Sequence, residues 1–163
     1  MNIEIRKRII THFTNAAASV YKKLTSDLMP VLGGLEKNKG NVITLDGYTV
    51  ILGFKGKFNG RFLLNLPFSE ALRLHEVIVG ESVDGINDEV LFTVSEMGNM
   101  IAGNAVTRIN DEFKGANIRL SPPSVFVGND VKFFNFKINA YNILLKTPKH
   151  HMRINIAIGE ETK

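Results

Sequence analysis

Glu96 and Asn99 are the two residues of this chain whose types and spacing suggest chemistry. They lie three positions apart in the segment 90–110, VLFTVSEMGNMIAGNAVTRIN, so on a helix both side chains project from one patch. The glutamate could act as a base or form an ion pair with a lysine of a partner. The asparagine has no useful pKa, but its carboxamide donates and accepts hydrogen bonds at once, which suits it to hold a water in line with an electrophile. About one Glu-x-x-Asn is expected by chance in this chain, so the spacing by itself favours a solvated helix face.

A long amphipathic helix is predicted to carry this pair, from about residue 88 to 113. Its apolar face holds Val90, Leu91, Val94, Met97, Ile101, Ala105 and Ile109. Its opposite face holds Glu89, Phe92, Glu96, Asn99, Gly103, Thr107 and Asn110. Phe92 and Met100 would add an apolar contact rim, and Gly103 would leave a shallow place where another backbone could approach closely.

The N-terminal half predicts two helices around a group of strands. Residues 2–29 have helical periodicity, ended by Pro30 and the Gly33-Gly34 pair. A short helix over 70–79 has Ser69 as its candidate cap, and a polar loop follows it. The strands between these helices are expected at 41–45, 48–54 and 60–66, with Asp46-Gly47 as the first turn.

The C-terminal half predicts further strands. They are expected at 116–120, 124–128, 132–146 and 152–158, the last with one buried and one wet face. This element order favours an α+β fold, with long helices packed on an antiparallel sheet, in a single domain over 1–163. Strand 132–146 carries large apolar residues on both faces, so it must be covered or paired. A two-fold symmetric homodimer is therefore expected.

Composition and charge limit the partners. The formal net charge is +4, but the basic residues are scattered and no nucleic-acid-binding signature accompanies them, so no nucleic acid is expected. The chain has no cysteine and no apolar run long enough to cross a bilayer. The basic N-terminal helix could lie on a membrane, but its Ala-rich face favours a core helix. We therefore expect a cytoplasmic protein without membrane insertion.

Motif analysis excludes several kinds of chemistry. The chain has no P-loop, no dinucleotide-binding glycine fingerprint and no G-x-S-x-G elbow. His12 and His75 have no metal-ligand spacing, and His150-His151 is better explained as a solvated turn than as a metal clip. No metal or cofactor is therefore expected on this chain. If the Glu96/Asn99 pair acts in phosphoryl hydrolysis, the substrate must supply the metal and the cation itself.

A family resemblance covers nearly the whole sequence. Residues 95–104, SEMGNMIAGN, resemble the active helix of the CheC/CheX/FliY chemotaxis phosphatases. The family pattern continues from the Asn through 22 residues to a Pro, and the same spacing from Asn99 ends on Pro122. Segments 13–24 and 56–67 are similar as well. With one Glu-x-x-Asn helix, the chain is most similar to the CheX branch, and the resemblance implies a CheC-like fold.

The resemblance also implies an activity. Such proteins hydrolyse the phospho-aspartate of the response regulator CheY, in a homodimer joined through its sheets. By carry-over, Asn99 would orient the attacking water, Glu96 would pair with the regulator's lysine, and the Mg²⁺ would belong to the phosphorylated receiver. The expected partner contacts are Phe92, Ser95, Met100, Gly103 and Pro122.

One residue departs from the pattern, and one alternative stays open. Phe92 stands where the family often has Asp or Ser, so a polar role at that position is lost. The alternative is a non-catalytic adaptor or flagellar-switch protein that binds a receiver domain without hydrolysing it.

Overall fold

Helices cover one face of an antiparallel sheet. The computed structural model describes residues 1–26, 29–135 and 138–159. Within them the strands form one seven-stranded sheet of order β1-β6-β7-β3-β2-β4, with β5 also paired to β2. The elements are α1 (Ile3–Thr25), β1 (Val31–Lys37), β2 (Val42–Lys55), β3 (Gly60–Leu66), α2 (Phe68–Val79), α3 (Asp88–Glu112), β4 (Arg119–Leu120), β5 (Ser124–Phe134), β6 (Asn139–Lys146) and β7 (His151–Ile158). The expected α+β class is confirmed.

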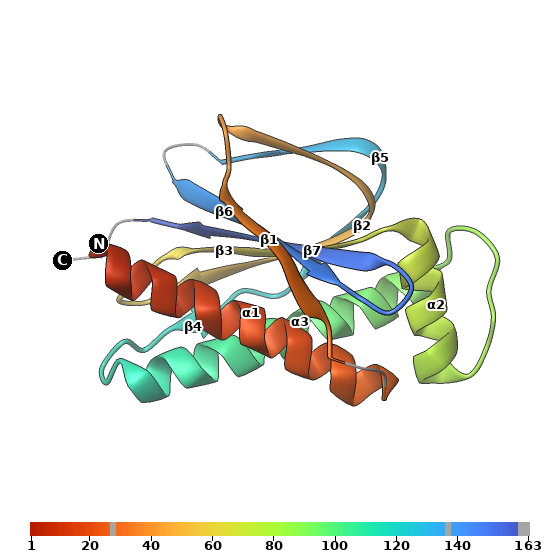
Figure 1. Ribbon diagram of the computed structural model, residues 1–163, viewed down its shortest axis with the longest axis horizontal. Coiled ribbons are helices and arrows are strands. Elements are labelled where there is room, and N and C mark those ends of the chain that lie inside the picture. The colour runs from red at the N-terminus through yellow and green to blue at the C-terminus, as the bar shows by residue number, and fades with distance from the viewer. Residues whose placement is uncertain (27–28, 136–137, 160–163) are drawn as a thin grey trace.

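The main core lies between the sheet and the pair α1 and α3, which run side by side beneath it (Figure 1). Phe13 of α1 stacks on Phe62 of β3 with ring centroids 5.1 Å apart, and both side chains are fully buried. Each such side chain contributes on the order of 1.5–3 kcal/mol through burial. Any residue that α3 presents outward is therefore held on a platform packed against the sheet.

β2 is one continuous strand, so the predicted turn at Asp46-Gly47 is wrong. The dipeptide instead lies at a register shift between β2 and β5, from Leu45 to Gly47, which is a bulge. Gly47 has φ 98°, and a Cβ added there would lie 2.2 Å from the carbonyl oxygen of Leu66. Only glycine fits at this position.

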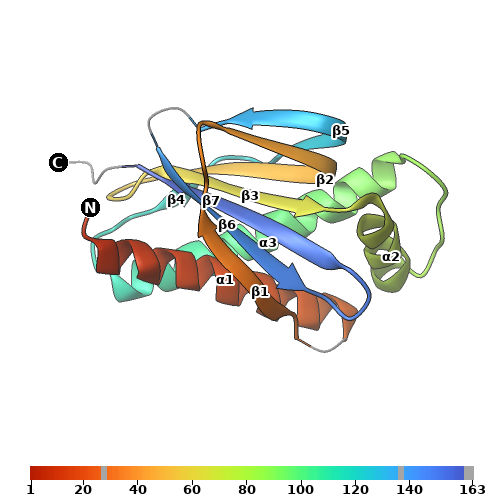
Figure 2. The ribbon, with the colours of Figure 1, turned by 45° about the horizontal axis from the view of Figure 1, so that its top comes forward.

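Beyond this bulge, β2 and β5 arch over the outer face of the sheet (Figures 1 and 2). A second apolar cluster consists of Ile43, Leu45, Leu63 and Phe133. Because this arch lies over a central part of the sheet, Asn155 of β7 is fully buried, and the predicted wet face of the last strand is wrong there. The Asn155 carboxamide is satisfied, accepting from Arg61 Nη2 at 2.6 Å and donating to Asn142 Oδ1 at 2.7 Å.

The sequence pattern misses β1. α1 ends at Thr25, because Ser26 adopts a left-handed conformation with φ 54° and its N–H donates to the carbonyl of Lys22. Residues 27–28 of the predicted first helix lie outside the described residues. The Gly33-Gly34 pair, predicted to stop the first helix, lies inside β1 instead, where the register against β6 shifts.

The C-terminal strands also differ from the prediction. The single strand expected over 132–146 is two strands, since β5 ends at Phe134 and β6 begins at Asn139; residues 136–137 lie outside the described part. β6 lies between β1 and β7, so β1 forms one edge of the described sheet, and all of its residues are exposed. Of the strand expected at 116–120, only β4 pairs.

The N-terminus of α2 differs from the prediction. α2 begins at Phe68 with Pro67 as its N-cap and no side-chain cap bond, so the predicted cap at Ser69 is wrong.

Of the helices that the structure describes, none combines the length and apolar character needed to span a bilayer.

Candidate functional site

α3 carries the predicted pair, and its two faces are as the sequence predicts except at Leu91. Asn87 caps the helix, since its Oδ1 accepts a hydrogen bond from the backbone N–H of Glu89 at 2.7 Å. The inward stripe is at most 1% exposed and consists of Val90, Val94, Met97, Ile101, Ala105 and Ile109. Leu91, predicted on the same face, is only half-buried.

The outward stripe of α3 consists of Phe92, Glu96, Asn99 and Gly103, which follow one another at one-turn intervals. The first three are exposed, and Phe92 is 68% exposed. Among the described residues, the side chains of Glu96 and Asn99 form no hydrogen bond or ion pair. A carboxylate and a carboxamide thus stand on a rigid helix with their bonding capacity free for another molecule.

Ser95 and Met100 lie at the margins of this stripe, and both are half-buried. Met100 packs partly against the main core. A partner could therefore touch only part of each side chain.

Within the chain, the close contact that a glycine permits occurs at Gly98, on the buried face, and the approach expected at Gly103 stays a prediction. A Cβ added to Gly98 would lie 2.8 Å from Cγ1 of Val50 on β2, whereas one added to Gly103 would have no neighbour within 4 Å. Gly98 lets α3 lie close to the sheet directly behind Glu96 and Asn99. Sequence reasoning missed this residue, because nothing in a one-dimensional pattern reveals the side chain that a glycine faces.

Pro122 lies in the segment between β4 and β5 and is exposed. The preceding Ser121 ties this segment to β2, since its N–H donates to the Gly53 carbonyl and its Oγ accepts from the Gly53 N–H, both at 2.8 Å. The Asn110 side chain of α3 bonds both backbone groups of Ile118, at 2.8 and 3.1 Å. α3 contacts β4 and β5, so Pro122 belongs to a connecting segment between two strands that flank the helix, rather than to the exposed stripe of α3.

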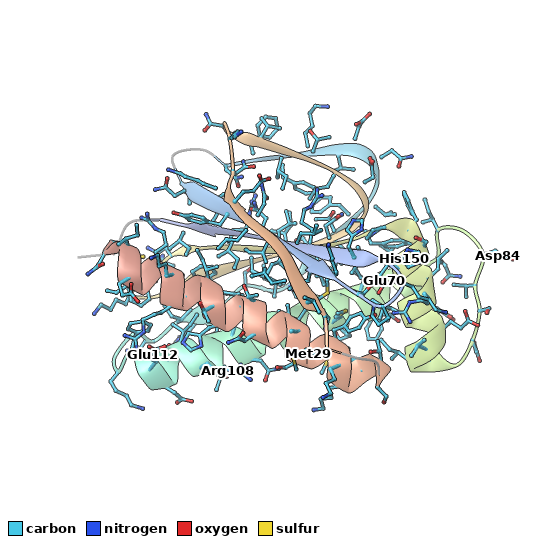
Figure 3. All side chains as sticks on the ribbon, viewed as in Figure 1. Met29, Glu70, Asp84, Arg108, Glu112 and His150 are labelled. Carbon is cyan, nitrogen blue, oxygen red and sulfur yellow. The ribbon has the colours of Figure 1, made fainter. Side chains whose placement is uncertain are left out.

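Phe92 instead lines a groove between α2 and the first turns of α3. The groove measures about 400 Å³ and is lined by His75, Val79, Glu81, Asp88, Glu89, Phe92 and Thr93. Its α2 wall is anchored to α1 through Tyr21, whose hydroxyl donates to the buried Glu70 carboxylate at 3.2 Å. Arg73 pairs with the same carboxylate at 3.1 Å (Figure 3 labels Glu70). Burial and the Glu70 charge raise the pKa of Tyr21 to about 12, so this phenol stays protonated.

The exposed stripe of α3 offers no metal cage. In the part of the chain that the structure describes, no group of three or more His, Cys, Asp or Glu side chains could hold a metal ion. Toward groups that a partner brings, the Glu96 carboxylate can form an ion pair or accept a proton, and the Asn99 carboxamide can donate and accept hydrogen bonds.

Comparison with known proteins decides the family. The family model described as chemotaxis phosphatase CheX matches residues 48–140, more than half of the chain and all of α3. The chain belongs to the CheX family. The family resemblance expected from the α3 motif and its spacing to Pro122 is thereby confirmed.

Individual proteins similar to this CheX family member are themselves CheX or CheC-like proteins. A Thermotoga maritima protein named CheY-P phosphatase CheX is 26% identical over 137 residues, covering 80% of this chain and 81% of that protein. The solved CheX–CheY–BeF3–Mg²⁺ complex from Borrelia burgdorferi contains a chain that is 27% identical, with a TM-score of 0.80 and coverage of 93% and 97%. A CheC-like superfamily protein from Shewanella sp. PV-4 has a TM-score of 0.84 at 19% identity, covering 98% of this chain and 100% of that one. The last similarity establishes a CheC-like fold.

Proposed function

We propose that this CheX family member hydrolyses the phospho-aspartate of a CheY-type response regulator. The observation that carries the proposal is the outward stripe of α3, on which Glu96 and Asn99 stand exposed and unpaired while the opposite face is buried. The matching family model is that of a chemotaxis phosphatase, and the Thermotoga maritima relative is named a CheY-P phosphatase.

Asn99 has the role of positioning water. Its Oδ1 accepts a hydrogen bond from a water molecule, so that a lone pair of the water points at the phosphorus opposite the aspartyl oxygen. The new P–O bond forms as the acyl-phosphate P–O bond breaks, and the aspartate carboxylate leaves. A carboxamide takes no proton, so the proton of the water passes to the phosphate product. The transition state is loose, so placement of the water and charge neutralisation supply most of the rate.

Glu96 has the role of docking. Its carboxylate pairs with the lysine of the receiver's active site, one helical turn from the water held by Asn99. The receiver supplies the Mg²⁺ that neutralises the phosphoryl oxygens, which fits the lack of a metal-binding cluster in the described part of this chain. In the same proposal the protein works in the cytoplasm, where its receiver is.

The test is release of phosphate from a phosphorylated CheY-type receiver with wild type, Asn99→Ala and Asn104→Ala. Asn104 is a matched control, because it is an exposed asparagine on the same helix whose side chain already donates to the Met100 carbonyl. Wild type and Asn104→Ala should accelerate release, and Asn99→Ala should lose about 100-fold in kcat, as expected when a positioning group is removed. Binding of the receiver without acceleration by wild type would replace hydrolysis with the adaptor function.

A further inference from the structure

The groove between α2 and α3 contains a buried histidine that the proposed hydrolysis does not use. His75 is 1% exposed, and its Nδ1 lies 2.8 Å from the Thr93 hydroxyl oxygen. That hydroxyl donates its own hydrogen to the Glu89 carbonyl at 3.0 Å, so it has only lone pairs for the imidazole. The hydrogen of the neutral ring must therefore be on Nδ1, which leaves Nε2 as an acceptor.

The lone pair of His75 Nε2 meets no hydrogen-bond donor in the described part of the chain. This nitrogen is buried and makes no hydrogen bond to any described residue, which costs free energy unless something outside satisfies it. The nearest charged group is the Glu89 carboxylate, 3.7 Å away, whose side chain is 64% exposed. With the ring neutral, two acceptors thus converge on one point of the groove, and a hydrogen-bond donor, best a cation, can satisfy both.

The surroundings of the groove also select a cation. Residues 76–107 hold six acidic side chains and no lysine or arginine, in a chain whose net charge is +4. The acids are Glu76, Glu81, Asp84, Asp88, Glu89 and Glu96, and Figure 3 places Asp84 on the loop that projects beside α2. With no metal-binding cluster among the described residues, the apolar walls at Val79 and Phe92 fit the alkyl stem of an organic cation.

We propose that this groove binds a lysine or arginine side chain of the same receiver domain, as a second contact beside Glu96. The cation donates to His75 Nε2 and the Glu89 carboxylate, and its stem packs on Phe92. Phe92 lies one turn before Glu96 on the outward stripe of α3, so a receiver seated on Glu96 also covers the mouth of the groove. This inference rests on the proposed function, because it takes the receiver as the occupant.

The experiment measures the Kd of a beryllofluoride-activated CheY-type receiver and steady-state phosphate release for three variants. Glu89→Gln and Phe92→Ala change exposed residues and should leave folding intact. Each should raise Kd and KM at least fivefold, with a smaller effect on kcat, since a docking contact is lost. Glu89→Gln should also weaken the dependence of Kd on salt. Asp111→Asn is the matched control, because Asp111 is an exposed acid of α3 that lies outside residues 76–107 and does not line the groove.

A second readout examines His75 directly, because His75→Gln could fail to fold. In ¹⁵N spectra the His75 Nε2 signal should move from that of a bare ring nitrogen toward that of a hydrogen-bonded one when the activated receiver is added. Wild-type affinity of Glu89→Gln together with an unchanged Nε2 signal would overturn the inference while phosphate release still supports the proposed function. Failure of wild type to bind the receiver would overturn both.

Discussion

Removal of the Asn99 side chain and removal of the Glu96 side chain should have different effects on turnover and on affinity for the receiver. In the proposed mechanism Asn99 acts on the attacking water only, so its loss is a loss at the transition state. In the same mechanism Glu96 holds the receiver before and during the reaction, so part of its contribution is uniform binding. We therefore expect these two residues of one helix face to divide positioning and docking between them.

Glu96→Ala should lower kcat and also raise the Kd of a beryllofluoride-activated receiver by about tenfold, because the receiver's lysine loses its ion-pair partner. Asn99→Ala should change that Kd only a few-fold. Calorimetric or fluorescence titration of both variants, with circular dichroism to check folding, makes the comparison. Equal losses of affinity in the two variants would contradict this division of roles.

Whether each of these residues can be predicted depends on whether a pattern along the sequence marks it or only a contact in the folded chain does. Glu96 and Asn99 can be found in sequence because the helical period of the buried stripe places them outward and a family pattern includes them. His75 and Gly98 cannot be found this way. His75 matters because of Thr93 and Glu89, and Gly98 because of Val50 on another element, and both are relations that exist only in the folded chain.

At the scale of elements, α3 was predictable and β1 was not. A helix of 25 residues repeats its period over several turns, whereas β1 is seven residues long, exposed throughout and contains two glycines. The Asp46-Gly47 pair misled for a related reason, since a turn and a bulge both need a glycine with positive φ. Long-range pairing of β2 with β5 decides between the two.

Two glycines of α3 should respond in opposite directions to alanine. Gly98→Ala should destabilise the fold by about 1–3 kcal/mol, because its Cβ would press on Val50. Gly103→Ala has open space and should stabilise it by up to ~1 kcal/mol through helix propensity. Urea unfolding of each variant measures these values.

The mechanism for Gly98 can be checked by relieving the contact. In a Val50→Ala background the penalty of Gly98→Ala should fall by at least half, since the two sites are coupled. A penalty that stays the same in this background would mean that a different contact limits the approach of α3 to β2.

At the scale of the whole molecule, the exposed edge β1 supports the expected homodimer better than the strand from which it was predicted. On β1, the side chains of Val31, Leu32 and Leu35 are 66%, 55% and 56% exposed. The outer side of β1 pairs with no other strand of the described sheet, so its backbone groups there are available to a second chain. We expect light scattering at micromolar concentration to give twice the chain mass of 18.1 kDa. Leu35→Lys should shift the equilibrium toward monomer, and a wild-type monomer would contradict the prediction.

Stability should fall on acidification. The pKa of His12 is lowered by burial, and the charges of Arg108 and Arg8 add to this. The pKa of His151 is lowered by burial, with Arg153 and His150 adding to it. Because both imidazoles take up protons less readily folded than unfolded, their contribution is fully present above about pH 6.5, the ordinary histidine value, and is lost as pH falls through the folded pKa values.

This dependence can be measured by denaturant unfolding at pH 7.5 and at pH 5.5. His12 contacts the Glu112 carboxylate, which also pairs with Arg8 (Figure 3 labels Glu112). His12→Gln can keep a neutral hydrogen bond to Glu112 without titrating, so it should reduce the difference between the two pH values. An unchanged or larger difference in this variant would exclude His12 as a source.

The order of strands in the sheet has a consequence for how the chain folds. β7 is the last strand in the described sequence, yet it lies between β6 and β3 in the middle of the sheet. Until β7 has been synthesised, β3 and β6 have no neighbour on the sides where β7 pairs, and the apolar faces of α1 and α3 lack part of the surface they bury. Non-local pairing of this kind slows folding, and unpaired strand edges expose intermediates to aggregation. A chain cut within the β6–β7 turn should therefore collect in the insoluble fraction, even though it retains every residue of the exposed stripe of α3.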